Sequence, residues 1–148
     1  MATFTQILYQ IVFSTKNAEN TMVLEETEKL YRYIWGILKN KKCTLYQING
    51  TKNHIHIISH IHPTIAISSL IKDIKVSSSV WIKDGKIFPD FTSWQEGYGA
   101  FTYHINQKEI LVKYAKNQRE HHKVKTFREE LIDLLKEHGI EFDEKYLQ

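Results

Sequence analysis

Histidine recurs along one short apolar segment, residues 53–62, which reads NHIHIISHIH. A β-strand sends successive side chains to opposite faces, so a strand here would gather the histidines on one face and most isoleucines on the other. The histidines concerned are His54, His56, His60 and His62. Because His54 and His56 are neighbours on that face, both can reach one metal ion, whereas the other two lie too far along the strand to join it.

Three further strands and four helices are predicted along the chain. The strands are predicted at residues 5–14, 43–48 and 98–104, the first of them from a regular alternation of side chains. The helices are predicted at residues 24–39, 64–81, 107–122 and 126–138, from apolar residues at helical spacing.

Local signals refine this layout. Asn49–Gly50 is typical of a hairpin turn and would join the second and third strands as an antiparallel pair. Thr126 with Glu129 three residues later forms a capping-box signature that opens the last helix. Residues 83–97 are rich in turn-forming residues and predict a loop. Its aromatic side chains would either pack in the core, which we expect, or be available for stacking; they are Phe88, Phe91 and Trp94.

The order of these elements is β-α-β-β-α-β followed by further helices. This is the split βαβ pattern of the ferredoxin-like α+β fold, with a four-stranded antiparallel sheet. We expect one domain over residues 1–148, with its core at about 5–122 and a C-terminal helix and tail at 123–148. The first two helices would cover one sheet face, so the histidines would lie on the face that those helices leave open.

Composition narrows the class of protein. The chain is 42% hydrophobic and 25% charged, which is typical of a globular domain, and its net charge is only +3. The charges are unevenly placed: residues 107–128 carry seven basic and two acidic side chains, whereas residues 129–148 carry seven acidic and two basic ones. A basic segment of this kind can be a nucleic-acid footprint or a solvated helix face.

Cellular location is predicted from what the sequence lacks. Cys43 is the only cysteine, so an internal disulfide is excluded and a buried reduced thiol is expected. No apolar run approaches the length of a membrane span, and no signal-peptide pattern opens the chain. We therefore expect a cytoplasmic protein without a membrane partner.

Tyr114 and Gln118 are four residues apart and share one face of the helix predicted at residues 107–122. A phenol can act as a nucleophile in covalent catalysis, and an amide carbonyl is a hard oxygen ligand. If Gln118 lay beside His54 and His56, a divalent ion would gain a third ligand, with Tyr114 one turn away. A metal that polarises a phosphate oxygen beside a tyrosine hydroxyl can promote attack on a DNA phosphodiester.

Three motifs together resemble the HUH superfamily of single-strand DNA endonucleases. They are HIH at residues 54–56, GYGAF at 97–101 and VKYAKNQREHH at 112–122. Their order and the elements that carry them are similar to those of its single-tyrosine transposases, the small insertion-sequence transposases and their REP-associated relatives. The resemblance covers roughly residues 5–122 and continues into HHKVKTFREEL at 121–131.

The resemblance implies a role for each matching residue. His54 and His56 match the metal-binding histidines, Gln118 matches the third ligand, and Tyr114 matches the nucleophile. It also implies Mg²⁺ or Mn²⁺ as cofactor. The reaction would leave a 5′-phosphotyrosine intermediate and a 3′-OH, which can be rejoined.

The partners implied are single-stranded DNA with hairpin-forming ends and a second copy of the chain. In the insertion-sequence members the tyrosine helix of one subunit completes the partner's site, whereas REP-associated members can be monomers. Side chains on the basic segment are expected to contact DNA, namely Lys113, Lys116, Arg119, His121 and His122.

Two other functions stay open from the residues alone. One is a single-stranded nucleic-acid binding module without catalysis, built on an open sheet. The other is a metal nuclease that activates water in place of Tyr114, and which would form no covalent adduct. Tyr103, beside His104, is a competing nucleophile but has no partner at ligand spacing.

Overall fold

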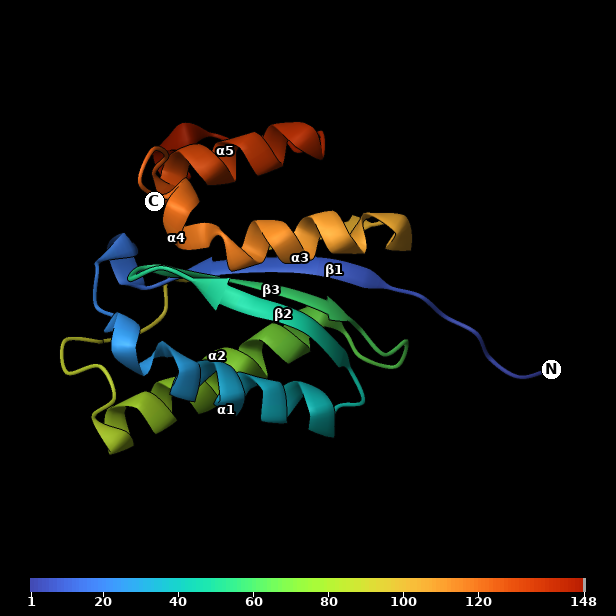
Figure 1. The fold of residues 1–148 in the computed structure, drawn as a ribbon, viewed down its shortest axis with the longest axis horizontal. Coiled ribbons are helices and arrows are strands. Elements are labelled where there is room, and N and C mark those ends of the chain that lie inside the picture. The colour runs from blue at the N-terminus through green and yellow to red at the C-terminus, as the bar shows by residue number, and fades with distance from the viewer. Residues whose placement is uncertain (148) are drawn as a thin grey trace.

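A computed structural model describes residues 1–147 (Figure 1). Its strands are β1 (Leu8–Ser14), β2 (Thr44–Gly50), β3 (His54–His60) and β4 (Gly99–Tyr103). Its α-helices are α1 (Thr27–Asn40), α2 (Ile67–Gly85), α3 (Lys108–Lys116), α4 (Gln118–His121) and α5 (Phe127–Glu137). Over these residues, no helix is both long enough and apolar enough to cross a membrane.

The four strands form one sheet in the order β2-β3-β1-β4, and every neighbouring pair is antiparallel. This order, with α1 and α2 crossing between strands, confirms the predicted ferredoxin-like topology. β3 lies at the centre of the sheet, where His56 pairs with Val12 of β1 and with Asn49 of β2. The histidines are therefore held by backbone ladders on both sides.

The main hydrophobic core lies between the sheet and helices α1 and α2, which run below it in Figure 1. Alternation along β1 and β3 supplies the sheet side, and the helices supply leucine and isoleucine at 3.6 spacing. The three aromatic side chains of the loop before β4 are buried in this core, as predicted. Trp94 also donates a hydrogen bond from Nε1 to Ser78 Oγ at 2.9 Å, which fixes that loop against α2.

The opposite face of the sheet is also covered, contrary to the expectation that it stays open. Figure 1 shows α3 and α5 above it. Leu111 and Ala115 of α3 pack on Ile58 and Leu8, while apolar side chains of α5 pack on β1 and β4. Because this face carries apolar side chains as well as histidines, packing α3 and α5 against it removes apolar surface from water.

Two predicted boundaries were wrong. Asn49 and Gly50 are not a turn, because both belong to β2 and the chain reverses at residues 51–53. The helix predicted at 107–122 is broken at Asn117, whose φ and ψ are −95° and 17°. The Lys116 carbonyl accepts a hydrogen bond from Asn49 Nδ2 at 2.9 Å, which takes it out of the helical ladder and separates α3 from α4.

Two other helices differ at their ends. The helix predicted from residue 64 begins at Ile67 and continues beyond residue 81 to Gly85. The helix predicted from residue 24 begins as a 3-10 turn, Leu24–Glu26, before α1. The capping box at Thr126 and Glu129 is confirmed in full.

Gly50 meets the backbone at the β2–β3 reversal, which leads to a stability prediction. A Cβ at this position would overlap the backbone carbonyl oxygen of His54. We expect Gly50→Ala to lower the free energy of unfolding by about 2–3 kcal/mol, since neither backbone segment can move aside without disturbing the ladder. Urea denaturation would measure it.

Gly36 in α1 provides the matched control, because a Cβ there would meet nothing within 4 Å. Gly36→Ala should raise the free energy of unfolding by about 0.5–1 kcal/mol through its better helix propensity. Equal unfolding midpoints for the two variants would contradict the close approach at Gly50.

Candidate active site

His54 and His56 open β3 and are both fully buried. His54 Nδ1 lies 2.7 Å from Asn53 Oδ1, and His56 Nδ1 lies 3.1 Å from Gln10 Oε1. These amide oxygens accept the Nδ1 protons and turn each Nε2 toward the space beneath the C-terminal helices. Holding a histidine through its second nitrogen is the usual way to orient a metal ligand.

Gln118 reaches the same space from the start of α4. It is fully buried, and its Oε1 lies 3.0 Å from His54 Nε2. Tyr114, one turn earlier on α3, packs its ring edge-on against His56 with centroids 5.7 Å apart. The two histidines, the glutamine and the tyrosine are thus brought together within one chain.

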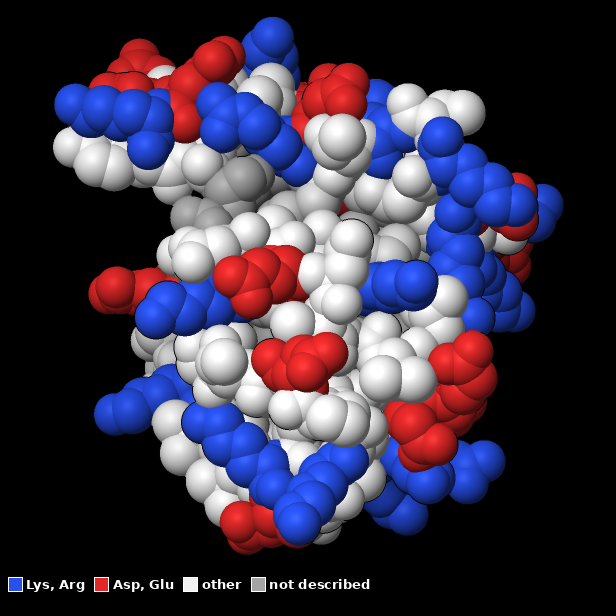
Figure 2. Space-filling model, turned by 90° about the vertical axis from the view of Figure 1, so that its left-hand side faces the viewer, with Lys and Arg blue, Asp and Glu red and all other residues white. Residues whose placement is uncertain are grey.

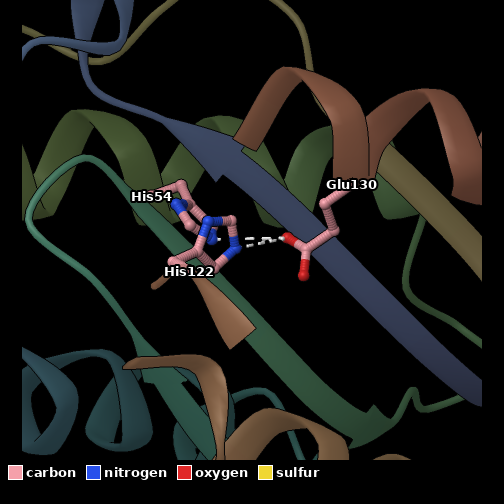
Figure 3. A group of neighbouring side chains, drawn as sticks. All are labelled: His54, His122 and Glu130. Atoms are coloured by element: carbon pink, nitrogen blue, oxygen red, sulfur yellow. Dashed lines mark ion pairs between the residues drawn. The ribbon is translucent and has the colours of Figure 1, made fainter. Parts of the chain in front are cut away.

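Glu130 of α5 also enters the cluster, and sequence reasoning missed it. Its carboxylate is 2% exposed and lies among the imidazoles (Figure 3). Oε1 is 2.7 Å from His56 Nε2 and 3.4 Å from His54 Nε2. Oε2 accepts hydrogen bonds from the Tyr114 hydroxyl and from Gln118 Nε2. A signal was present, since Glu130 lies on the stripe of α5 that also buries Phe127 and Leu134.

His122 lies beside this cluster as well. Its ring packs on that of His54 at 4.3 Å, and its Nε2 is 3.1 Å from Glu130 Oε1 (Figure 3). The ligand atoms of His54, His122 and Glu130 all lie within 4.8 Å of one another. His122 was predicted only as a DNA contact, because sequence spacing does not show that the chain folds back after α4.

The other residues predicted to contact DNA lie around the site. His121 stacks on the Tyr114 ring at 4.7 Å. Lys113 and Lys116 are exposed, and Arg119 donates to Thr27 Oγ1 at 3.2 Å. Tyr103, the competing nucleophile, is held by Gln10 Nε2 at 3.0 Å and by His138 Nε2 at 2.9 Å.

Burial sets the protonation states in this cluster. It lowers the pKa of His54 to about 4, so this imidazole is neutral at physiological pH. Burial opposes the charge on Glu130, but the contacts with His122, His54 and His56 outweigh it and lower the pKa of the carboxyl below its usual range. Burial and the neighbouring carboxylate raise the pKa of Tyr114, so its hydroxyl keeps its proton in the resting state.

The donor set fits a small divalent cation. Its amide and carboxylate oxygens are donors that suit Mg²⁺ and Mn²⁺, and its imidazole nitrogens are donors for divalent transition metals. His54 Nε2 and Gln118 Oε1 are 3.0 Å apart. Two adjacent ligands of an octahedral ion are also about 3.0 Å apart when each metal–ligand bond is about 2.1 Å. His54 and Gln118 are therefore spaced as adjacent metal ligands would be, and His56 Nε2 faces the same cluster through Glu130 Oε1.

Two cavities flank the buried cluster. One, of about 290 Å³, lies between α3 and α5, is lined by Tyr114 and Glu130, and carries Asp133 and Glu137 on its wall. The other, of about 360 Å³, lies next to His122 at the β2–β3 reversal and is lined by Lys52 and Arg119. Figure 2 views this end of the molecule, where lysine and arginine side chains are spread over the surface with acidic side chains between them.

Comparison with known proteins gives both a family match and structural neighbours. The family model described as "Transposase IS200 like" matches residues 3–118, whereas no curated protein matched the chain. A crystal structure of a provisionally assigned transposase from Deinococcus radiodurans R1 is 17% identical with a TM-score of 0.63, covering 80% of this chain and 95% of that one. A REP-associated tyrosine transposase bound to a REP hairpin is 12% identical with a TM-score of 0.62, covering 82% and 72%. At these identities the structural likeness shows the fold.

Proposed function

Because this chain belongs to the family of IS200-like transposases, we propose that it cuts and rejoins single-stranded DNA with Tyr114 as the nucleophile. The observation that carries the proposal is the meeting of His54, His56, Gln118 and the Tyr114 hydroxyl around one buried point. These are the residues whose motifs resemble the family's machinery.

The chemistry is a transesterification at a DNA phosphate. The Tyr114 oxygen forms a bond to phosphorus and the bond from phosphorus to the 3′ oxygen breaks, giving a 5′-phosphotyrosine and a 3′-OH. Tyr114 loses one proton and the leaving oxygen gains one, so no proton is consumed. Since a phosphodiester is exchanged for a phosphodiester, the reverse reaction rejoins a strand without an external energy source.

The metal would be Mg²⁺ or Mn²⁺, held by His54, His56 and Gln118. Such an ion, when bound, polarises a non-bridging phosphate oxygen and offsets the charge that develops during attack. The protein's own part is to fix both imidazoles through Asn53 and Gln10, and to hold Tyr114 against His56.

The expected DNA is single-stranded with hairpin-forming ends, in keeping with the hairpin bound to the REP-associated neighbour. The tyrosine helix lies against the histidines of its own chain, so one copy holds all of the proposed residues. A dimer that exchanges these helices stays a prediction. The covered sheet face argues against a binding module that stacks bases on an open sheet.

The test is to incubate the protein with a hairpin-bearing oligonucleotide from the DNA that flanks its gene, with Mg²⁺ or Mn²⁺. We expect a protein–DNA adduct that survives denaturing gel electrophoresis and is absent when EDTA is added. Cleavage without an adduct would instead indicate that water is the nucleophile.

The basic cavity beside His122 leads to a prediction about DNA affinity. Lys52 is exposed on the rim of this cavity. Lys83 is exposed near the C-terminal end of α2, which covers the opposite face of the sheet. We expect Lys52→Ala to weaken single-strand binding and to reduce the slope of log K against log salt by about 0.7, the value for one lost phosphate contact. Lys83→Ala should leave that slope unchanged in fluorescence anisotropy titrations. Equal slopes for both variants would exclude this route for the strand.

A further inference from the structure

The Glu130 carboxylate lies where several lone pairs meet. Asn53 Nδ2 donates to the Ala18 carbonyl at 3.2 Å, which turns Asn53 Oδ1 toward His54 Nδ1. This contact selects the tautomer with the ring proton on Nδ1 and a lone pair on Nε2, the form in which an imidazole binds a metal. That lone pair faces Gln118 Oε1 at 3.0 Å and Glu130 Oε1 at 3.4 Å.

His56 presents its Nε2 in the same way. Its Nδ1 is turned to Gln10 Oε1, so Nε2 points at Glu130 Oε1, 2.7 Å away. Two imidazole nitrogens, an amide oxygen and a carboxylate oxygen, all of them atoms that can bind a metal, thus converge on one region with neighbouring atoms 2.7 to 3.4 Å apart. Among residues 1–147 the ion-pair partners of Glu130 are the imidazoles of His54, His56 and His122, and a divalent cation would be a stronger partner for this buried carboxylate.

We propose that Glu130, supplied by α5, is a further protein ligand of the divalent metal through Oε1, and that its Oε2 positions the Tyr114 hydroxyl. This inference rests on the proposed function. It extends the site beyond residues 3–118, the part of the chain that the family model matches. One carboxylate then links the metal to the nucleophile.

A consequence is that metal binding stabilises the docking of α5. This helix contacts the site through Glu130 and through Phe127, whose ring stacks on His54 at 4.5 Å. An ion bound to both Glu130 and the β3 histidines would connect α5 directly to the centre of the sheet. Amide exchange in residues 127–137 should then slow when the metal binds.

The experiment measures Mn²⁺ binding to the full chain by calorimetry, without DNA. We expect Glu130→Gln to weaken Mn²⁺ affinity by about tenfold or more, since the amide keeps the shape but loses the charge. Glu137→Gln is the matched control, because it makes the same charge change two turns along α5 without contacting the cluster, and it should bind Mn²⁺ as the wild type does.

Hydrogen exchange of the wild-type protein provides a second measurement that needs no variant. Added Mn²⁺ should slow exchange in α5 at least several-fold. Unchanged exchange there, or a Glu130→Gln protein that binds Mn²⁺ as tightly as or more tightly than Glu137→Gln, would overturn the role of Glu130 as a ligand.

The proposed function is tested separately, by the tyrosine adduct. If the wild-type protein forms the adduct and the Glu130→Gln variant binds Mn²⁺ as tightly as the wild type, Glu130 is not a ligand and the proposed transposase chemistry stands. If the wild-type protein forms no adduct and Glu130→Gln lowers the affinity for Mn²⁺, the proposed transposase chemistry is rejected and Glu130 remains a metal ligand.

Discussion

Replacing Tyr114 by phenylalanine is expected to abolish the covalent adduct with DNA and to lower cleavage by a factor on the order of 10³ or more. The hydroxyl is the atom that would attack phosphorus, and its removal takes away no other proposed participant. The phenyl ring keeps the packing against His56 and the stack with His121. Glu130 Oε2 keeps its hydrogen bond from Gln118 Nε2 at 3.1 Å, so the loss of stability should be about 1 kcal/mol.

The adduct is best followed with an oligonucleotide labelled at its 3′ end, because the tyrosine retains the downstream fragment through its 5′-phosphate. Tyr103→Phe is the comparator, since Tyr103 is the other tyrosine near the site and its hydroxyl is held by Gln10 and His138. It should retain the adduct. An adduct that persists in Tyr114→Phe but disappears in Tyr103→Phe would reassign the nucleophile.

The second large effect is expected from replacing His54 and His56 together by alanine. Metal-dependent cleavage should fall by a factor on the order of 10³ or more, because two of the proposed ligands are lost at once. The change also removes two fully buried rings that contact Glu130, so the free energy of unfolding should fall by about 2–4 kcal/mol.

Chemistry and folding must therefore be measured on the same sample. Circular dichroism would establish the fraction folded, and Mn²⁺ calorimetry would show the loss of the binding site. His62→Ala is the control, since His62 follows β3 and its imidazole, among residues 1–147, hydrogen-bonds to Thr64, and it should cleave as the wild type does. A folded double variant that still cleaves at the wild-type rate would exclude a metal centre at these histidines.

The sheet and its order were predictable because strand signals are local. The alternation in residues 5–14 and the histidine pattern in β3 each show which side chains share one face of the sheet. Four strands connected by two crossing helices then allow only a few topologies. The family was likewise predicted correctly, because the motifs that carry the resemblance are local: His54 and His56 lie on β3, and Tyr114 and Gln118 lie on either side of the short α3–α4 junction.

Glu130 shows where such reasoning stopped. It lies in a separate helix, and its approach to β3 depends on a chain reversal at residues 122–126 that no periodicity specifies. The Asn49–Gly50 prediction failed for a related reason. The pair has turn chemistry, but Gly50 is required inside β2, where the His54 carbonyl leaves no room for a Cβ. Tertiary contact, not local preference, decided both positions.

The break at Asn117 also separates the nucleophile from a ligand. Tyr114 belongs to α3 and Gln118 to α4, and Asn117 between them leaves the helical geometry. In an unbroken helix the two side chains would travel together. On the proposed chemistry, the break separates the residue that would hold a DNA end from the proposed ligand Gln118, so a shift of α3 need not displace Gln118 from His54.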